Sequence, residues 1–495
     1  MLLDGGRLAP VSVRRRGILF HFASVSGLWL VHLAIGSPVV TLVAGGLVMA
    51  FTYIKLGLDE LLAAPLRLSP LSFYFFWLTV RAGVSPSYAG YCIFSGETLQ
   101  LGPWAVAPED IASGYLIFLT GCVCLHTGLE YFRSPDRSES AANGSYSNTR
   151  FLWLAGIMYV VGLIGLMKPT LTDPLGSNLQ PLVLFGPITA LSCFALANRE
   201  LDLPPLAFAA IMALGTIGLA VGNLHFGSKG QLMFSLFPLI WFFLLYRPRW
   251  LPLVFAAGLV IYPVVFQVVS LRRANSGNYA DKQSRVESDE LAGQMLDAFQ
   301  QWRHGARLEE DSNSRDNGTA HELLMRQLAP LPVGFIAREV SEGGLLMGSS
   351  LDYVGYAFVP RLLWPDKPGV LPGTWFTYRL GMADSASPLY ATTVVAQEAS
   401  GELYWNFGIV GVVAGMSTLG ALLGRLWRMT GDDPHRDPLR MMLYILVMLS
   451  FQEMPEAGTV LVGAVARFII FATALYLQKI FFEKEPEAHF SLPQL

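Results

Sequence analysis

"PVVTLVAGGLVMAFTYIKL", residues 38–56, contains a single charged residue, Lys55, in a stretch long enough to cross a bilayer as a helix. A membrane-spanning helix needs roughly 20 mostly apolar residues. Similar stretches lie on both sides of it, and over the whole chain 53% of residues are hydrophobic and only 14% are charged. Soluble domains typically carry about 25% charged residues. The sequence therefore predicts an integral membrane protein.

Apolar stretches recur along the chain and predict an all-α, polytopic fold with about twelve transmembrane helices. The third stretch is the weakest, because Arg81 lies within it. The predicted organisation is an N-terminal bundle of about nine helices (1–270), a large loop lobe (271–405) and a C-terminal bundle of about three helices (406–495). The twelve stretches are 17–35, 38–56, 70–86, 110–130, 151–168, 181–198, 204–222, 230–246, 250–270, 406–427, 440–456 and 459–481.

Lys and Arg are unevenly distributed among the predicted loops. Arg14–Arg16 precede the first span, Arg247 and Arg249 follow the eighth, and the alternate short loops contain almost none. Short loops rich in Lys and Arg stay on the cytoplasmic side of a membrane. Both termini are therefore expected in the cytoplasm, and the long segment 271–405 is expected on the outer side.

The outer segment is too long to be expected as a structureless loop, so we predict a small helical lobe. "TAHELLMRQL" (319–328) begins with Thr319 and has Glu322 three residues later, a spacing typical of a helix-capping box. Pro330 is expected to end this helix. His321, beside Glu322, is expected on its surface.

The chain contains four cysteines, whose positions predict neither a disulfide framework nor a zinc motif. Three of them fall within apolar stretches, where a small side chain packs well. We therefore expect no metal and no cofactor. The cysteines are Cys92, Cys122, Cys124 and Cys193.

"VPRLLWPDKPG" (359–369) is a proline-rich turn in the outer segment that carries Arg361 and Lys367. Proline fixes backbone torsions, and Trp364 suits the membrane–water boundary. A rigid turn of this kind can hold the Arg361 side chain in position to bind a phosphate through two parallel hydrogen bonds. The alternative is an interfacial anchor whose cations contact lipid phosphates. Arg272 and Arg273, directly after the ninth span, have the same two interpretations.

Four acidic residues and two arginines within predicted spans complete the candidate set. Glu398 and Glu402 are spaced i, i+4, which places them on one helix face just before the tenth span. Either can serve as a base, or both are solvated residues at a helix start, where the dipole favours acids. Arg467 lies inside the last span and is expected to pair with an acidic partner. Glu453 and Glu456 are at a suitable depth, and Arg81 is expected to make a similar ion pair.

Three stretches resemble the O-antigen polymerases, the Wzy-type polymerases of oligosaccharide repeat units. These are "VGYAFVPRLLWPDKPG" (354–369), "EASGELYWNFGIVGVVAGM" (398–416) and "HFGSKGQLMFSLF" (225–237). In the last stretch this chain has Lys229 where the polymerases and the related O-antigen ligases usually have arginine. Lysine supplies a positive charge but cannot form the two parallel hydrogen bonds to a phosphate that an arginine guanidinium can form.

The resemblance implies a glycosyltransferase of the bacterial inner membrane that acts on a polyprenyl-pyrophosphate-linked oligosaccharide at the outer face of the bilayer. It implies a metal-independent transfer of the growing glycan onto another lipid-linked repeat unit, with a flippase and a chain-length regulator as further partners. Arg361 would neutralise the departing pyrophosphate, with assistance from Lys367 or Lys229. Glu398 or Glu402 would accept the proton of the sugar hydroxyl.

Four other functions stand against this one. A purely structural or assembly protein stays open if the turn 359–369 is only an interfacial anchor. An O-antigen ligase differs only in its acceptor, so the sequence leaves it open. A flippase of lipid-linked oligosaccharides would also have about twelve spans, but short outer loops, unlike segment 271–405. A metal-dependent transferase would carry acidic residues in its first outer loop, and "IGSP" (35–38) has none.

Overall fold

The computed structural model describes a mostly helical chain. Its described residues are 11–63, 70–133, 156–164, 186–191, 194, 204–226, 297, 300, 319–357, 359, 364, 372–382, 395–430, 438–452 and 456–482.

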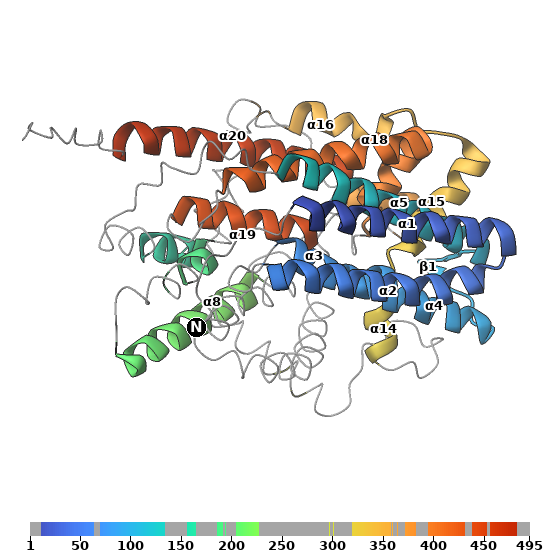
Figure 1. Ribbon diagram of the computed structural model, residues 1–495, viewed down its shortest axis with the longest axis horizontal. Coiled ribbons are helices and arrows are strands. Elements are labelled where there is room, and N and C mark those ends of the chain that lie inside the picture. Colours follow the sequence, from blue (N-terminus) through green and yellow to red (C-terminus); the bar gives the residue numbers. More distant parts are fainter. Residues whose placement is uncertain are drawn as a thin grey trace, which may run out of the picture.

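Within the part of the chain that the structure describes, five long helices form a framework and run alongside one another in Figure 1. Each is long and apolar enough to cross a membrane. Three of them come from the N-terminal part of the chain and two from the C-terminal part, and each contains one of the predicted spans. They are α1 (Val11–Ile35), α2 (Pro38–Ala63), α5 (Pro108–Arg133), α18 (Ala399–Met429) and α20 (Ala457–Phe482).

The count of twelve spans stays a prediction, because several of them are not described in full. The predicted spans 230–246 and 250–270 lie outside the described residues, and 151–168 and 181–198 are described only in part. The predicted span 204–222 is α8 (Pro205–Phe226), and 440–456 corresponds to α19 (Pro438–Gln452). The third predicted span is helical but not uniform: α3 (Pro70–Leu78) leads into a π-helix, η1 (Thr79–Val84), and then into α4 (Ser85–Phe94).

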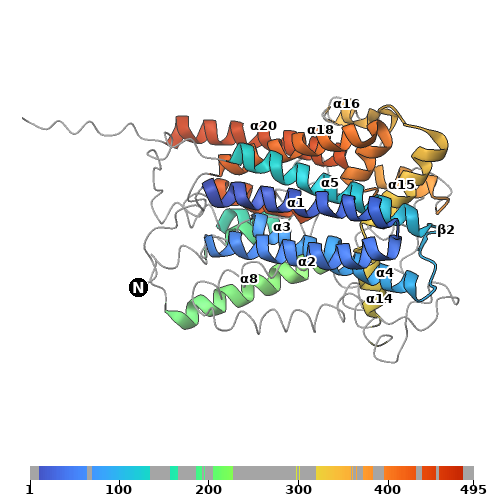
Figure 2. The same ribbon diagram turned by 45° about the vertical axis from the view of Figure 1, so that its right-hand side comes forward.

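Short elements gather at one end of the bundle, on the right in Figures 1 and 2. Strands β1 (Gln100–Leu101) and β2 (Trp104–Ala105) form an antiparallel hairpin there, with Gln100 opposite Ala105. We call this the hairpin end. It also holds the short helices α14 (Thr319–Arg326), α15 (Pro330–Gly343) and α17 (Pro372–Arg379). The elements η5 (Ser349–Leu351) and α16 (Asp352–Ala357) follow α15 in the chain, and α16 lies at the top of Figure 1, nearer the middle of the molecule.

Two sequence predictions about segment 319–382 can be compared with the structure. The helix predicted from Thr319 is confirmed as α14. Pro330 does follow its end, but it also opens α15, because proline at the first position of a helix loses no hydrogen bond. His321, expected on the surface, is instead only 20% exposed and contacts Tyr88 of α4.

Helix α15 belongs to the hydrophobic core of the bundle, although its residues were predicted as part of an outer lobe. Val333, Phe335 and Ile336 are at most 3% exposed and lie in the same core cluster as α5 and α18. The backbones of α15 and α5 meet closely, since a Cβ on Gly334 would lie 2.7 Å from the carbonyl oxygen of Asp110. Small residues allow such close helix approach. The described part of the loop is therefore anchored in the bundle.

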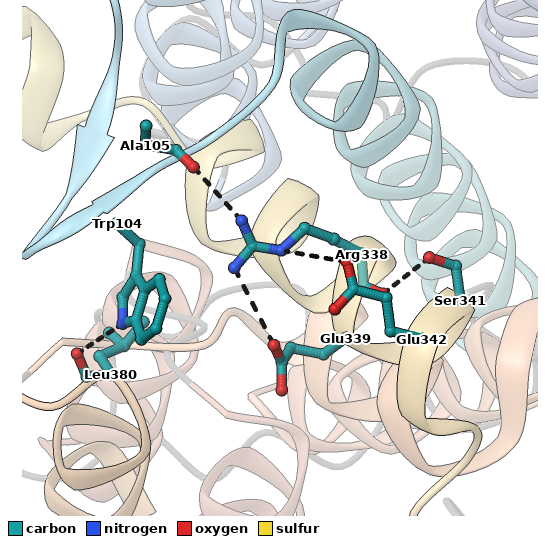
Figure 3. Close-up of polar contacts among 7 residues, drawn as sticks. All are labelled: Trp104, Ala105, Arg338, Glu339, Ser341, Glu342 and Leu380. Atoms are coloured by element: carbon teal, nitrogen blue, oxygen red, sulfur yellow. Dashed lines mark hydrogen bonds and ion pairs between the residues drawn. The ribbon is translucent and has the colours of Figure 1, made fainter.

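Arg338 of α15 fastens the hairpin to this helix, as Figure 3 shows. Its Nη1 donates to the carbonyl of Ala105 at 3.3 Å, and its guanidinium lies 4.9 Å from the ring centre of Phe335. Trp104 is 5.8 Å from the same guanidinium and donates its Nε1–H to the carbonyl of Leu380 at 2.9 Å. These contacts hold the hairpin, α15 and the end of α17 together.

A polar cluster lies buried among the helices α1, α2 and α5. His21 is fully buried, with its Nδ1 3.2 Å from Nδ1 of His126 and its Nε2 3.0 Å from the hydroxyl of Tyr53. Buried polar groups destabilise a core unless they are hydrogen-bonded. The mutual contacts of the three side chains meet this requirement and fix how these helices face one another.

Candidate functional site

The π-helix η1 sets the position of Arg81. Pro86, at the second position of α4, has no N–H to donate to the carbonyl of Ala82 four residues earlier. The hydroxyl of Tyr115 on α5 donates to that carbonyl instead, at 2.6 Å. The proline thus explains why regular α-helical bonding fails here, and such single π turns often occur at functional sites. Arg81 lies on this turn and is its single charged residue.

Helix α18 begins with a strained residue and bends after its second turn. Glu398, just before the helix, has a φ of 60°, which is uncommon for any residue other than glycine. Gly408 has a φ of 63° and a ψ of −158°, a conformation essentially restricted to glycine. The helix is therefore broken at "NFG", residues 406–408, into a short piece at the hairpin end and a long spanning piece.

The backbone groups released by this bend are satisfied by the loop after α15. The carbonyls of Trp405 and Asn406 accept from the N–H groups of Leu346 and Met347, at 2.9 and 3.2 Å. The side-chain amide of Asn406 accepts from the N–H of Gly348 at 2.9 Å and donates to the carbonyl of Glu402 at 2.7 Å. Broken helices at membrane depth are tolerated where other protein groups replace the lost bonds.

A buried ion pair joins the π-helix to the start of α18. Nη2 of Arg81 donates to Oε1 of Glu398, and the two side chains are only 13% and 7% exposed. The guanidinium also lies 5.9 Å from the ring centre of Phe118 on α5. Charges within a membrane bundle are costly unless paired. The ion pair predicted for Arg81 therefore exists, and its partner is Glu398, 317 positions further along the chain.

A cavity lies beside this ion pair, and several polar groups that line it have no hydrogen-bond partner. Among the described residues, Nε1 of Trp77, Nε of Arg81 and Oγ of Ser400 are buried without a hydrogen-bond partner. All three residues line the cavity. Leaving a buried donor unpaired costs about 1–3 kcal/mol. Three such groups around one space mark a place where a ligand oxygen can be bound. The remaining lining residues are Tyr74, Leu78, Phe118, Cys122, Glu398, Ala399 and Met416.

Glu402 has a different environment from Glu398. It is fully buried, its Oε1 accepts from Nε2 of Gln397 at 3.0 Å, and its Oε2 accepts from the N–H of Gly458 at 3.0 Å. Gly458 is in the first turn of α20, where unpaired N–H groups and the helix dipole favour a carboxylate. Glu402 therefore caps α20 from α18. It does not line the cavity.

The interpretation of both glutamates as solvated residues is wrong. Glu398 is 5% exposed and Glu402 is 0% exposed, because residues 395–402 enter the bundle and do not stop at its surface. Of the two, only Glu398 lines the cavity. The i, i+4 spacing suggested one common helix face, but Glu398 precedes the helix with a non-helical backbone conformation, a φ of 60° and a ψ of 142°.

Most of the predicted phosphate-binding residues lie outside the described residues, namely Arg361, Lys367, Lys229, Arg272 and Arg273. Their roles remain predictions. Trp364 is described, 41% exposed, with its ring centre 6.1 Å from that of Tyr356 on α16. Glu453, one expected partner of Arg467, also lies outside the described residues, while Glu456 is buried just before α20.

Two residues of the cavity, Trp77 and Ser400, could not be identified as site residues from the sequence. Trp77 and Ser400 look like ordinary members of an apolar span and a helix start. A charged residue within a span usually has a function, so Arg81 was the available indication that this region matters. Trp77 lies four residues before it, on the same side of the helix.

Comparison of the chain with models of protein families, with curated proteins and with solved structures finds no match.

Proposed function

We propose that this protein is a membrane glycosyltransferase that polymerises oligosaccharide repeat units carried on a polyprenyl pyrophosphate. The proposal combines the sequence resemblance to O-antigen polymerases with the site around Arg81 and Glu398. In this assignment the hairpin end faces outward, and the lipid-linked glycan approaches from the outer leaflet of the bacterial inner membrane. The orientation follows from the positions of Lys and Arg in the predicted loops.

In the proposed reaction a sugar hydroxyl of one lipid-linked unit attacks the anomeric carbon of the glycan on another. A new glycosidic C–O bond forms, the bond between that carbon and the pyrophosphate oxygen breaks, and polyprenyl pyrophosphate leaves with the electron pair. The hydroxyl proton passes to a carboxylate. Pyrophosphate is already a good leaving group, so the main requirement is fixed positive charge in a site sheltered from water.

The observation that carries the proposal is the buried pair of Arg81 and Glu398 beside a cavity with unused hydrogen-bond donors. We assign Glu398 as the base, because it is the carboxylate that lines the cavity. Burial raises the pKa of its carboxyl group, which suits a proton acceptor, and the ion pair with Arg81 opposes that rise. We assign Trp77 and Ser400 to the binding of substrate oxygens. Arg361 keeps the role predicted for it, neutralisation of the pyrophosphate.

The test is polymerisation by purified protein supplied with lipid-linked repeat units, followed as a ladder of products on a gel. We expect a ladder from the wild type and only single units from Glu398→Gln and Arg361→Ala. Asp59→Asn is a matched control, because Asp59 forms an exposed ion pair with Lys55 at 2.7 Å on α2. Loss of a carboxylate from that pair should leave the ladder unchanged. An undiminished ladder from Glu398→Gln would remove Glu398 from the mechanism.

The same assay separates the proposal from its alternatives. A ligase would leave lipid-linked units unjoined and attach glycan only when a lipid A core acceptor is added. A flippase would form no glycosidic bond with either acceptor, and would move the lipid-linked unit across sealed vesicles. Either result would replace the polymerase assignment.

A further inference from the structure

Three side chains of different ligand types meet at the hairpin end, outside the cavity described above. Sγ of Cys92, a carboxylate oxygen of Glu97 and a ring nitrogen of His321 all lie within 4.8 Å of one another. Cys92 is on α4, Glu97 follows that helix, and His321 comes from α14, more than two hundred positions later. Such a meeting of thiol, carboxylate and imidazole is the usual composition of a transition-metal site.

The end of α4 fixes Glu97 beside Cys92. The N–H of Glu97 donates to the carbonyl of Cys92 at 2.9 Å, and the N–H of Gly96 donates to the carbonyl of Ile93 at 3.0 Å. These two bonds, with a φ of 82° at Gly96, define a Schellman motif. The left-handed conformation favours glycine at this position. The backbone itself therefore holds the carboxylate next to the thiol.

The ring of His321 is oriented from the other side by Tyr88. The Tyr88 hydroxyl lies 3.0 Å from Nδ1 of His321, and Nε2 faces Glu97, 3.8 Å from its Oε1. Tyr88 and Cys92 are spaced i, i+4, so they share the face of α4 that meets α14. With Nδ1–H donating to the tyrosine, Nε2 keeps its lone pair directed toward the other two ligands. Metal-binding histidines are commonly oriented in this way by a hydrogen bond at their second nitrogen.

The three ligand atoms, all within 4.8 Å of one another, can be compared with the spacing in a zinc site. Zinc bonds of about 2.0–2.3 Å in a tetrahedral site place neighbouring ligand atoms about 3.3–3.6 Å apart. The 3.8 Å between His321 and Glu97 needs only a small rotation of side chains. Cys92 is 2% exposed, so metal binding would turn a buried polar group into a ligand.

We propose that Cys92, Glu97 and His321 bind a Zn²⁺ ion that ties α14 to α4. Glu97 is 38% exposed, so an ion can reach the site from solvent. The role is structural: the ion links a short helix of segment 319–382 to the transmembrane bundle. This departs from the expectation that the cysteines bind no metal, because His321 and Glu97 come together only in the folded chain.

The test is the zinc content of the purified full-length protein, after removal of any affinity tag, by mass spectrometry. We expect about one zinc per chain in the wild type, as for a single structural site. Cys92→Ser and His321→Ala should lose it. Cys124→Ser is the matched control, because Cys124 is a half-buried thiol on α5 outside the cluster, and should keep it.

Two further measurements keep the test decisive if a variant folds poorly. Wild-type protein loaded with Co²⁺ should show the near-ultraviolet absorption of a thiolate–cobalt bond. Tyr88→Phe should keep the site but weaken Zn²⁺ binding by about 10–100-fold, the usual effect of removing an orienting hydrogen bond. Metal-free wild type that also lacks the cobalt band after loading, or equal zinc in Cys92→Ser and wild type, would overturn the proposal. None of these assays uses glycan, so their failure leaves the proposed function untouched.

Discussion

Replacing Glu398 with glutamine leaves the Arg81 guanidinium buried without a counter-charge. Removing one member of a buried ion pair typically costs about 3–5 kcal/mol. Glutamine can still accept one hydrogen bond from Nη2, so we expect the lower value, about 3 kcal/mol. An unfolding entropy of about 2.1 cal/mol/K per residue converts 1 kcal/mol into about 1 °C for a chain of 495 residues. The expected fall in Tm is therefore about 3 °C.

The reverse replacement, Arg81→Met, should cost less. A buried carboxylate left alone can take up a proton, whereas a guanidinium stays charged at every accessible pH. The change also removes the unpaired Nε of Arg81 from the protein interior. We expect a loss of about 2 kcal/mol, smaller than that of Glu398→Gln.

The double variant Arg81→Met/Glu398→Gln tests whether the stability losses of the two single variants depend on each other. With neither charge present, we expect a total loss of about 2 kcal/mol, far below the sum of the two single losses. The measurement is thermal unfolding in detergent at one scan rate, followed by tryptophan fluorescence, for all four proteins. If the single losses simply add in the double variant, the two side chains do not depend on each other, and the argument for a coupled buried pair fails.

Three further variants test the elements that build the site. Gly408→Ala should lower Tm and reduce polymerisation, because alanine is strained by about 1–2 kcal/mol at this positive φ; an unchanged Tm would show that α18 is not bent as described. Glu402→Ala should lower Tm by about 1–3 °C through loss of the cap on Gly458, while the protein that remains folded still polymerises; an inactive but fully stable variant would contradict this. Tyr115→Phe should cost about 1–3 kcal/mol, because the Ala82 carbonyl then lacks its donor; equal Tm values for variant and wild type would show that this bond does not support η1.

The membrane class and much of the helical framework could be predicted from the sequence. Length and apolar composition of a stretch are local properties, and they sufficed for α1, α2, α5, α18 and α20. The start of α14 was also predictable, because capping depends on residues three positions apart. Charge within the third span further indicated that Arg81 needs a partner.

The composition of the candidate site depended on the tertiary structure. Periodicity shows which face of a helix a residue occupies, but not which distant segment packs there. Arg81 meets Glu398 across 317 positions, and His321 meets Tyr88 across 233. Glu398 and Glu402 could not be told apart by their spacing, yet one lines the cavity and the other caps α20. Burial and partners are set by how helices pack against one another, and that information is spread over the whole chain.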